Sequence, residues 1–529
     1  LAKSCDAGPF WVDEVTDVRS CAAVHRAILE HATADPERAA VKDLGRDLSY
    51  ADLCDEAGRL AAGLVARGVR DGDRVVLHLP NSVDFAVAAL ACLWVGATFV
   101  PLSVTDPVAR LAGILDDCDP VLALTVATGD DGPAASLALG RFPWVSMAEL
   151  LSIGAEVPDP VDGSNRVAYA IYTSGTTGKP KGVMIGNGAF LAAVRATVSA
   201  LSLGTETRTL CVSPFHFDGS FGTLFPTLFA GGAVVIRPRE SLLYPRTFFN
   251  AVIQESVTYT GFSPTYLRLL LSSPQVSKLA SSTLLVALGG EASSAADIRA
   301  LWAAAPQVQV YNRYGPTETT IAVTHIEVTA DLIEDGTVPI GQPHPGVDFY
   351  LVDDRGQVID QPGRVGELFI GGSQLMAGYW GAPELTKQVL STDIVPGQTL
   401  YKTGDLVYRD ITGDYVYVDR ADRVIKRSGV RISLIEMGES MSKLPGVSSA
   451  ACLTFDDDGD LGIVAFVVVD SGVTAFDLQR AARQVLPETM LPNRIQIVDS
   501  LPLTPSSKLD ERSLLAQAGL HELGLARTA

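Results

Sequence analysis

The sequence predicts an α/β protein with a large N-terminal domain and a small C-terminal domain, and three observations support this. The chain has 529 residues, more than one hydrophobic core normally organises, so two or more domains are expected. Helical apolar spacing alternates with short apolar runs from about residue 45, which predicts α/β layers rich in parallel strands. From about residue 348, shorter strands between Gly and Asp turns predict a small β-rich subdomain.

The first alternating elements lie between residues 45 and 125. Residues 49–68 have helical spacing and end at Gly68, and residues 73–79 form a predicted strand. Residues 85–102 are uncharged and long enough to be considered as a membrane span. Because Gly96 and Pro101 interrupt this segment, it is better interpreted as a buried helix followed by a buried strand.

The same rhythm continues through the middle of the chain. Predicted strands are followed by helical or apolar stretches in three further pairs: 209–214 with 222–236, 258–264 with 265–271, and 283–291 with 296–305. The β-rich subdomain is predicted from segments 347–359, 366–372 and 405–420.

A new α+β pattern begins after Asp422. Strands are expected at 462–469 and 493–499 around a helix at 475–486. We therefore place the domain boundary near residue 420, which gives an N-terminal core of 1–420 and a mobile C-terminal domain of 421–529.

Charge and cysteine content narrow the function classes. The formal net charge of −20 argues against general nucleic-acid binding, because a polyanion would be repelled. The seven cysteines are scattered and form no CxxC pair, which indicates reduced thiols in a cytoplasmic protein. The first residues contain no long apolar run of the kind found in a secretory signal. Neither a nucleic-acid partner nor a membrane is expected.

The stretch YTSGTTGKPKGV, residues 172–183, follows an apolar strand and is rich in hydroxyls, glycine and lysine. Backbone N–H groups and side-chain donors of such a loop can surround phosphate oxygens. It is not a Walker loop, because only two residues separate Gly175 from Gly178 and Pro180 follows Lys179.

Five further motifs accompany this loop along the chain: GGEASS at 289–294, NRYGPTETT at 312–320, YKTGDL at 401–406, DRADRVIKRSGVRIS at 419–433 and LPLTPSSKLDERSL at 501–514. In this order and spacing, the chain resembles the adenylate-forming superfamily, which comprises acyl-CoA synthetases, luciferases and the adenylation domains of nonribosomal peptide synthetases. The resemblance extends from LSYADL at 48–53 to the last lysine motif.

The resemblance implies that a carboxylate attacks the α-phosphate of ATP, giving an acyl-adenylate and pyrophosphate. Thr317 would bind the α-phosphate region and Glu318 would help hold Mg²⁺, a hard ion that prefers oxygen ligands. The loop residues implied to bind the β- and γ-phosphates are Thr173, Ser174, Gly175, Thr176, Thr177, Gly178 and Lys179. The implied nucleoside site comprises Asn312 and Tyr314 beside the adenine, the backbone of Gly290 and Glu291, and Asp405 and Arg420 at the ribose.

The resemblance also implies that the C-terminal domain presents two different faces to the active site, one for adenylation and one for thioester formation. Lys508 corresponds to the family's catalytic lysine, which stabilises charge between the substrate carboxylate and the α-phosphate. Ser507 departs from the glycine usual in the family, which puts the mobility of that loop in question. Asp422 would be the hinge about which this domain rotates, and Gly429 would line the tunnel for a phosphopantetheine arm.

The motif FHFDGSFG, residues 215–222, bears on the choice of acid. Members that activate amino acids place an aspartate here against the substrate ammonium, and Asp218 matches it. The resemblance places the rest of the substrate pocket at Gly219, Gly222, Gly261, Ala287, Gly289, Arg313, Ile321 and Ala322. Because most of these are Gly or Ala, we expect a sizeable alkyl or aryl tail, with Gly222 as the size gate. Arg313 could pair with an acidic substrate group, but the apolar setting favours an outward orientation.

The segment FDGSFGTLFPTLFAGG, residues 217–232, resembles the corresponding segment of stand-alone enzymes that activate β-amino acid starters for macrolactam polyketides. We therefore expect a β-amino acid with a medium-chain alkyl or aryl tail, although the residues alone leave α and β open. An α-amino acid adenylation domain of a nonribosomal peptide synthetase and an acyl-CoA ligase remain alternatives.

The expected thiol acceptor is a holo carrier protein acting in trans, because only fifteen residues follow Leu514 and they contain no carrier motif. Carrier proteins are acidic, so a local basic face is expected to dock one. The candidate residues are Arg420, Arg423, Lys426, Arg427 and Arg431.

Overall fold

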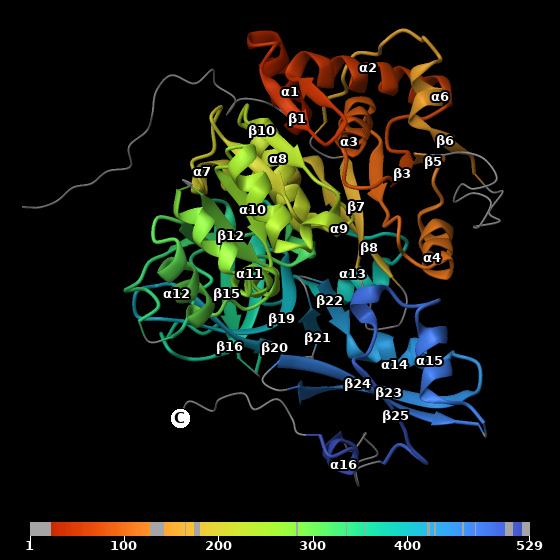
Figure 1. The fold of residues 1–529 in the computed structure, drawn as a ribbon, viewed down its shortest axis with the longest axis vertical. Coiled ribbons are helices and arrows are strands. Elements are labelled where there is room, and N and C mark those ends of the chain that lie inside the picture. Colours follow the sequence, from red (N-terminus) through yellow and green to blue (C-terminus); the bar gives the residue numbers. More distant parts are fainter. Residues whose placement is uncertain are drawn as a thin grey trace, which may run out of the picture.

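The computed structural model describes most of the chain: residues 23–126, 142–163, 166–173, 180–281, 284–334, 336–353, 355–420, 424–427, 430–457, 460–470, 472–502 and 511–520. Within β20, β21, β22 and α14, and at residues 281 and 512, several side chains lie outside this description. The α/β architecture predicted from the sequence is confirmed, with a large N-terminal domain, a β-rich subdomain in the form of a half-barrel and a small C-terminal domain (Figure 1).

The first large sheet has the strand order β14-β13-β12-β11-β9-β10-β1-β2. Its inner strands pair in parallel, whereas β14 and β2 pair antiparallel at the two edges. The strands are β1 (Ala39–Lys42), β2 (Asp47–Ser49), β9 (Arg208–Cys211), β10 (Ala233–Ile236), β11 (Tyr259–Phe262), β12 (Leu285–Gly289), β13 (Gln309–Tyr314) and β14 (Thr324–Val328).

The second large sheet has the order β17-β8-β7-β4-β3-β5-β6, in which β8 pairs antiparallel with both β17 and β7 and the remaining neighbours are parallel. Its strands are β3 (Arg74–His78), β4 (Thr98–Pro101), β5 (Leu122–Thr125), β6 (Trp144–Ser146), β7 (Val167–Thr173), β8 (Lys181–Gly186) and β17 (Gly378–Tyr379).

Helices cover both sheets, and the main buried cluster joins side chains of several helices to strands of both sheets. The helices of this domain are α1 (Val24–Ala34), α2 (Tyr50–Ala66), α3 (Val83–Val95), α4 (Val108–Cys118), α6 (Met147–Leu151), α7 (Asn187–Ala200), α8 (Phe221–Phe229), α9 (Arg239–Leu242), α10 (Pro245–Gln254), α11 (Pro264–Leu271), α12 (Ala295–Ala304) and α13 (Pro383–Val389). Short 3-10 turns lie at η2 (Asp218–Ser220), η3 (Pro274–Ser281) and η4 (Thr317–Thr319).

The apolar segment considered above as a membrane span is a buried helix followed by a buried strand, as predicted. Helix α3 ends at Gly96, whose φ of 75° is a left-handed conformation that favours glycine, and β4 follows. In the part of the chain that the structure describes, no helix is long and apolar enough to cross a membrane.

The β-rich subdomain forms a sheet of order β15-β16-β19-β18, with β20 pairing with β19. Its strands are β15 (Val347–Val352), β16 (Gly366–Gly372), β18 (Leu390–Ser391), β19 (Leu400–Arg409) and β20 (Tyr415–Arg420). Strand β19 is important for the site, because Asp405 lies in its middle and its side chain is buried.

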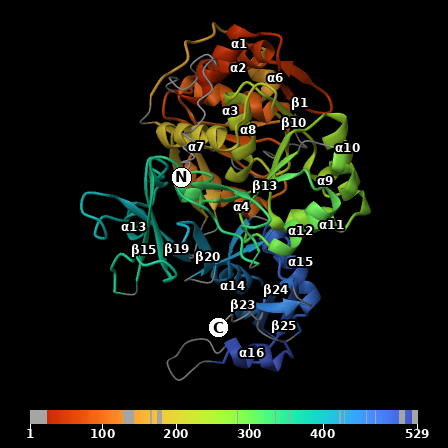
Figure 2. The ribbon, with the colours of Figure 1, turned by 90° about the vertical axis from the view of Figure 1, so that its left-hand side faces the viewer.

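The C-terminal elements gather at one end of the molecule, beside the N-terminal layers (Figures 1 and 2). They are β21 (Val424–Arg427), β22 (Val430–Ser433), α14 (Leu434–Ser442), β23 (Val447–Asp457), β24 (Asp460–Val469), α15 (Ala475–Ala482), η5 (Glu488–Met490), β25 (Arg494–Ile497) and α16 (Glu511–Gln517). Strand β23 and helix α14 were not predicted, and they complete the buried cluster of this unit.

Five cysteines lie among the described residues, namely Cys54, Cys92, Cys118, Cys211 and Cys452, and all five are free and buried. Burial raises the pKa of each thiol, so they pack as small apolar groups and are poor nucleophiles.

Candidate active site

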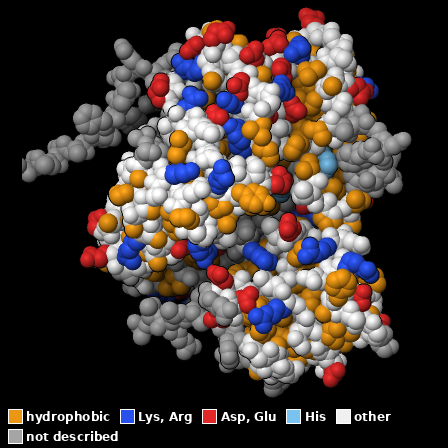
Figure 3. Space-filling view, in the orientation of Figure 1, with side chains coloured by type: hydrophobic (Ala, Val, Ile, Leu, Met, Phe, Trp, Pro, Cys, Tyr) orange, Lys and Arg blue, Asp and Glu red, His pale blue; other side chains and the backbone are white. Residues whose placement is uncertain are grey.

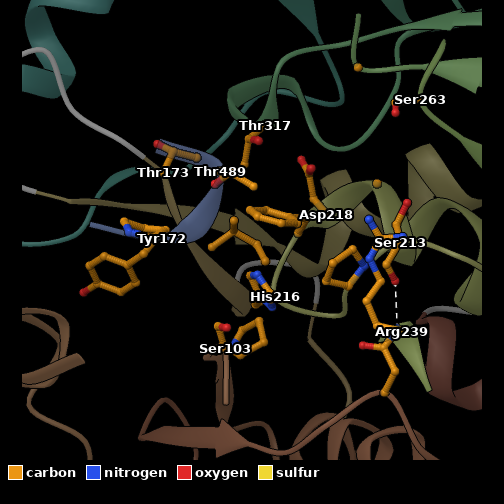
Figure 4. Close-up of a pocket in the computed structure, with 18 of the residues that line it drawn as sticks. Ser103, Tyr172, Thr173, Ser213, His216, Asp218, Arg239, Ser263, Thr317 and Thr489 are labelled. Atoms are coloured by element: carbon orange, nitrogen blue, oxygen red, sulfur yellow. Dashed lines mark hydrogen bonds between the residues drawn. The ribbon is translucent and has the colours of Figure 1, made fainter. Parts of the chain in front are cut away.

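A cavity of about 480 Å³ opens where the carboxyl ends of parallel strands from both large sheets meet. From one sheet, β11, β12 and β13 and the residues directly after β9 line the cavity; from the other, β4 and β7 and the residues directly after β3 line it. The turn 487–490 of the C-terminal domain lines the same cavity. This edge is where ligands bind in open α/β sheets. Figure 4 shows Asp218, Thr317, Thr173, Thr489 and His216 around it.

Asp405 lines one wall of the cavity and forms a buried pair with Tyr314, which is not itself part of that wall. The Tyr314 hydroxyl donates to Asp405 Oδ2 at 2.5 Å, and the Asp405 backbone N–H donates to Thr403 Oγ1 at 2.9 Å. Burial and the neighbouring carboxylate raise the pKa of Tyr314, so its hydroxyl keeps its proton and fixes the Asp405 carboxylate. The two residues come from β13 and β19, two strands far apart in the sequence.

Asn312 is buried on the same strand and its amide is held by protein groups. Its Nδ2 donates to Pro339 O at 2.7 Å, and its Oδ1 accepts from Ser293 Oγ at 2.8 Å. The Glu291 carboxylate accepts from the Thr265 backbone N–H and hydroxyl, so this side chain is also engaged. Gly290 lines the cavity with a φ of 88°, which leaves its backbone close to any occupant.

Glu318 is buried beside the cavity residue Thr317. Its Oε1 accepts from the Tyr379 hydroxyl at 2.8 Å, and its carbonyl accepts from the Met376 N–H at 2.8 Å. The Lys181 ammonium lies 5.3 Å from the centre of the Tyr379 ring, within the range of a cation–π contact. The start of β8 is therefore held close to the Glu318 carboxylate.

The turn after Glu318 has a strained backbone. Thr320 and Ile321 have φ values of 61° and 68°, in the left-handed region that β-branched residues avoid. The buried side chain of Gln374 holds this turn. Its Nε2 donates to Ala322 O at 2.7 Å and lies 3.3 Å from Thr320 O, while its own backbone carbonyl accepts from the Thr320 hydroxyl at 2.7 Å. Gln374 was not predicted from the sequence, since no motif contains it.

Two histidines extend this network behind the cavity. His344 Nδ1 lies 3.0 Å from Gln374 Oε1, and His325 Nδ1 lies 2.8 Å from His344 Nε2. Because an amide oxygen only accepts, His344 carries its proton on Nδ1, and His325 then donates from its own Nδ1. Burial lowers the pKa of both rings, so both are neutral at physiological pH.

Asp218 lies at the start of η2, directly before α8, and its carboxylate faces the cavity. Its Oδ2 is buried without a hydrogen-bond partner. Burial raises its pKa to about 6, although a hydrogen bond with Thr317 and the charge of Arg313 oppose that rise. An incompletely satisfied carboxylate at a cavity wall fits a cationic group of an occupant.

Arg313 corrects one expectation, because its side chain does not point outward. The residue is 8% exposed, it lines the cavity, and its Nη1 has no hydrogen-bond partner. Its Nη2 makes one long contact, 3.4 Å to Gly219 O. The cause is space: a Cβ on Gly289 would lie 2.5 Å from Arg313 Cγ, and one on Gly222 would lie 2.8 Å from Nη1.

This geometry also corrects the inference of a large empty pocket. Of the predicted pocket positions, Asp218, Gly219, Gly289, Arg313 and Ile321 line the cavity. The other four, Gly222, Gly261, Ala287 and Ala322, are absent from its wall. Gly222 and Gly261 lie behind the guanidinium, and Ala287 packs in a buried cluster with Tyr259. The small residues therefore make room for an arginine, and Gly222 does not gate the substrate directly.

Comparison with known proteins identifies this arrangement. The model of the family described as "AMP-binding enzyme" matches residues 28–380, and that of the "AMP-binding enzyme C-terminal domain" matches residues 436–508. The chain belongs to the AMP-binding enzyme family. Its members are adenylate-forming ligases, as the motifs indicated.

Among relatives of this family, tyrocidine synthase 3 from Brevibacillus parabrevis is 33% identical over 92% of this chain, which spans 8% of that protein. Phenyloxazoline synthase MbtB from Mycobacterium tuberculosis is 33% identical over 94% of this chain, which spans 34% of it. The chain thus covers about a third or less of these relatives' length.

Two solved structures of similar proteins cover almost the whole chain. IdnL1 superposes with a TM-score of 0.77 at 29% identity, over 91% of this chain and 99% of that one. Holo-PA1221, a nonribosomal peptide synthetase protein with adenylation and PCP domains, gives 0.83 at 26% identity, over 95% and 85%.

Several residues predicted from the AMP-binding family lie outside the described residues: Ser174, Gly175, Thr176, Thr177, Gly178, Lys179, Asp422, Arg423, Gly429 and Lys508. For Arg420, Lys426 and Arg431 the structure describes the backbone alone. Arg427 is half-buried, its Nη1 donates to Leu491 O at 2.8 Å, and burial lowers its pKa. Arg427 therefore holds two segments of the C-terminal domain together, which corrects its assignment to a free basic face.

Proposed function

We propose that this chain adenylates a β-amino acid with ATP and transfers the acyl group to the phosphopantetheine thiol of a separate holo carrier protein. The observation that carries the amino-acid part is Asp218, whose buried carboxylate oxygen lacks a partner at the cavity wall. A substrate ammonium would supply the missing counter-charge. This pairing stabilises the bound substrate because both charges leave water together.

The reaction proceeds by attack of the substrate carboxylate oxygen on the α-phosphorus, with pyrophosphate leaving. Thr317 lies at the cavity wall and its hydroxyl bonds Asp218 in the free enzyme; once a substrate ammonium pairs with Asp218, this hydroxyl would donate to an α-phosphate oxygen instead. The loop 173–179 would hold the leaving phosphates and Lys508 would stabilise the charge developing at the reacting oxygens. Catalysis of this kind depends on positioning and electrostatics.

The nucleoside would bind against the cavity wall at Asp405, whose carboxylate Tyr314 holds in place. One Asp405 oxygen accepts from Tyr314, and the carboxylate lines the cavity, where it would accept from the ribose hydroxyls. The backbone at Gly290 and Glu291 would flank the adenine together with Asn312. Arg420 would add a ribose contact from the end of β20.

Mg²⁺ would be held by Glu318 and phosphate oxygens. The donor set fits, since Mg²⁺ is usually bound by one or two carboxylates plus substrate phosphates. Within the described residues no group of three or more His, Cys, Asp and Glu side chains converges, so the protein alone offers no cage. Bound there, Mg²⁺ would neutralise charge on the phosphates. Tyr379, through its bond to Oε1, orients the Glu318 carboxylate.

The β-position of the amine is supported by the likeness of residues 217–232 to enzymes for β-amino acid starters. The likeness to holo-PA1221, a nonribosomal peptide synthetase protein, favours an α-amino acid as the second candidate. The sequence also predicted a medium-chain alkyl or aryl tail. Arg313 weakens the argument for such a tail, because its guanidinium fills the space beside the glycines from which the tail was inferred.

Transfer to the thiol would follow rotation of the C-terminal domain about Asp422, with Gly429 lining the path of the pantetheine arm. Docking of an acidic carrier would use the basic residues near the boundary other than Arg427. Figure 3 shows basic and acidic side chains interspersed on the face seen in Figure 1, so any steering field is local. The PCP domain in holo-PA1221 supports a carrier as the partner.

ATP–pyrophosphate exchange tests the proposal with isomeric pairs of α- and β-amino acids. We expect exchange with the β-isomer to exceed that with the α-isomer, and no exchange with the corresponding acid that lacks an amine. Preference for the α-isomer would overturn the β-assignment. Thioester formation with a holo carrier, and none with free coenzyme A, would separate this function from that of an acyl-CoA ligase.

A further inference from the structure

The guanidinium of Arg313 is a buried cation with an unused donor. Arg313 lies on β13 at the carboxyl edge of the large sheet, is 8% exposed, and lines the cavity. Its Nη1 has no hydrogen-bond partner, and its Nη2 reaches only Gly219 O at 3.4 Å. A guanidinium presents five donors in a planar fork, so most of the hydrogen-bonding capacity of Arg313 is unused among the described residues.

Glycines leave room for the Arg313 side chain along its whole length. Gly289, its register partner on β12, accommodates the stem, because a Cβ there would lie 2.5 Å from Cγ and 2.9 Å from Nε. Gly222 accommodates Nη1 and Gly261 accommodates Nη2, at 2.8 and 3.2 Å from their would-be Cβ atoms. Three glycines from α8, β11 and β12 thus form a cradle that fixes the guanidinium at the end of the cavity.

No carboxylate among the described residues forms an ion pair with this guanidinium within 4 Å. Asp218 interacts with Arg313 electrostatically, but the two side chains do not form a direct ion pair. A second buried arginine, Arg237, shows the usual solution. It is also 8% exposed, but its Nη2 pairs with Glu255 at 2.5 Å and its Nη1 donates to Ile236 O. Burying a charge without such a partner is costly, so Arg313 requires one from outside the protein.

We propose that Arg313 binds a second carboxylate of the substrate, so that this enzyme activates an amino dicarboxylic acid. This inference rests on the proposed function and replaces its apolar tail with an acidic one. The ammonium pairs with Asp218, one carboxylate is activated beside Thr317, and the other carboxylate accepts two parallel N–H bonds from Arg313. Every charge of the substrate then meets an opposite or hydrogen-bonding group.

The geometry also limits the length of the substrate. Nη2 of Arg313 lies against the carbonyl of Gly219, the residue directly after Asp218. The ammonium site and the second carboxylate site are therefore close neighbours. A carboxylate on the amine-bearing carbon, or one carbon further, satisfies both contacts, whereas a long acidic chain would overshoot. Aspartate, activated at its side-chain carboxylate, and β-glutamate (3-aminopentanedioate) belong to this class.

Pyrophosphate exchange with matched probes tests this inference. The acidic probes are aspartate and β-glutamate, and their neutral partners are isoasparagine and β-glutamine, in which only the second carboxylate becomes an amide. 3-Aminobutanoate and leucine complete the panel. We expect at least one acidic probe to exceed its amide in kcat/KM by on the order of 100-fold, as loss of a buried hydrogen-bonded charge pair implies.

Variants of Arg313 separate substrate recognition from a structural role. R313Q should lower kcat/KM for the acidic probe by on the order of 100-fold and remove or reverse the preference over the amide. R313K should retain part of the preference, because it keeps the charge but loses the planar fork. R237Q is the matched control: it leaves Glu255 with Lys42 as its remaining ion-pair partner, so it should lower the unfolding midpoint while the acidic-to-amide ratio stays unchanged.

The outcomes distinguish this inference from the proposed function. Efficient activation of 3-aminobutanoate with no activation of either acidic probe overturns the role of Arg313 and leaves β-amino acid adenylation standing. Activation of leucine alone overturns both. A preserved acidic preference in R313Q, or a larger loss of stability in R313Q than in R237Q, would make Arg313 a structural residue and also overturn the inference.

Discussion

If the substrate is an amino acid as proposed, Asp218 and Arg313 would prepare the cavity for its charged groups. Each has a buried polar atom without a partner, and they do not form an ion pair with each other. Holding opposite charges apart costs folding free energy, but it leaves both groups preoriented for an occupant. The free energy that folding loses is recovered as binding free energy, because the two side chains need less reorganisation when the substrate binds.

Replacing Asp218 by asparagine is expected to stabilise the free protein while abolishing amino acid activation. Burial raises the pKa of Asp218 from 3.8 to about 6. The folded state therefore binds more protons than the unfolded state between these values, and stability falls as pH rises through that window. Above it the penalty is complete, at most about 3 kcal/mol. A neutral asparagine side chain would carry no such penalty.

Thermal unfolding of both proteins across pH checks this prediction. The midpoint of D218N should exceed that of the unmodified chain at neutral pH, and the difference should shrink toward about pH 5 as Asp218 becomes protonated. S220A, which removes a buried hydroxyl two residues away, is a control that should not show this pH dependence. A D218N protein that is less stable at neutral pH would contradict the account of an unsatisfied carboxylate.

The same residue predicts how substrate affinity depends on pH. Only ionised Asp218 pairs with an ammonium, so KM for the amino acid should rise as pH falls below about 6, approaching tenfold per unit. The pKa of about 6 applies to the free enzyme, and a bound ammonium lowers it. Exchange kinetics from acidic to neutral pH measure this. A KM for ATP that rose in parallel would place the titrating group elsewhere.

At the scale of elements, the turn after Glu318 has a strained backbone directly beside the candidate catalytic residues Thr317 and Glu318. Left-handed φ values at Thr320 and Ile321 persist because Gln374, between β16 and β17, donates to the carbonyl of Ala322 and accepts from the Thr320 hydroxyl. Met376 adds a backbone bond to Glu318 O. The loop between these strands therefore positions Thr317 and Glu318 without touching an occupant itself.

Gln374→Leu is expected to loosen this turn. Loss of the side-chain hydrogen bonds should lower stability by roughly 1–3 kcal/mol and let Thr320 and Ile321 relax. Because Thr317 and Glu318 would act on the α-phosphate and the metal, kcat for adenylation should fall by about tenfold or more, with a smaller change in KM for the amino acid. A purely structural role would move the unfolding midpoint and leave this kinetic split absent.

Gln398→Leu is the matched control, because the Gln398 side chain accepts from the Tyr350 hydroxyl in the β-rich subdomain, away from the cavity wall. It should alter stability to a similar or smaller extent and leave kcat unchanged. Equal losses of kcat in both variants would attribute the effect of Gln374 to general destabilisation.

The sequence predicted elements better than it predicted orientations. Helix α2 was expected from its apolar spacing and Gly68, and the structure adds a capping box at Ser49 and Asp52. Strand β23 was missed because its polar residues obscure the apolar pattern before Phe455. Asp218 and Asp405 were predicted correctly as cavity residues because each lies in a recognisable local sequence motif. Gln374 belongs to no motif, and its role depends on a turn that only the fold places beside it.

Arg313 could not be oriented from sequence for a related reason. Strand alternation puts Arg313 on the face opposite Asn312 and Tyr314, but it does not say what covers that face. The space for its side chain comes from Gly222, Gly261 and Gly289, which lie on three different elements. A composition rich in glycine therefore indicated an empty pocket, although one long side chain occupies that space.

At the scale of the whole molecule, the C-terminal domain meets the N-terminal domain through the cavity and through exposed contacts. The turn 487–490 lines the cavity, and Arg268 lies 3.7 Å from Asp460 across the two units. Both side chains of that ion pair are exposed, so it contributes little, within about 1 kcal/mol. A weak contact of this kind is compatible with the rotation proposed about Asp422.

If the C-terminal domain presents two faces in turn, changes on the two faces should separate the half-reactions. Lys508→Ala should slow formation of the adenylate by several orders of magnitude, because the charge at the reacting oxygens loses its counter-charge, while transfer from a preformed adenylate to a holo carrier persists. Gly429→Leu should do the reverse, since a side chain in the tunnel would obstruct the thiol. Thr176→Ala should resemble Lys508→Ala with a smaller loss, because the loop 173–179 would act only on the leaving pyrophosphate.

Pyrophosphate exchange and single-turnover carrier loading measure the two steps. Equal loss of both half-reactions in Lys508→Ala and Gly429→Leu would mean that one arrangement of the two domains serves both steps, and rotation about Asp422 would then be unnecessary.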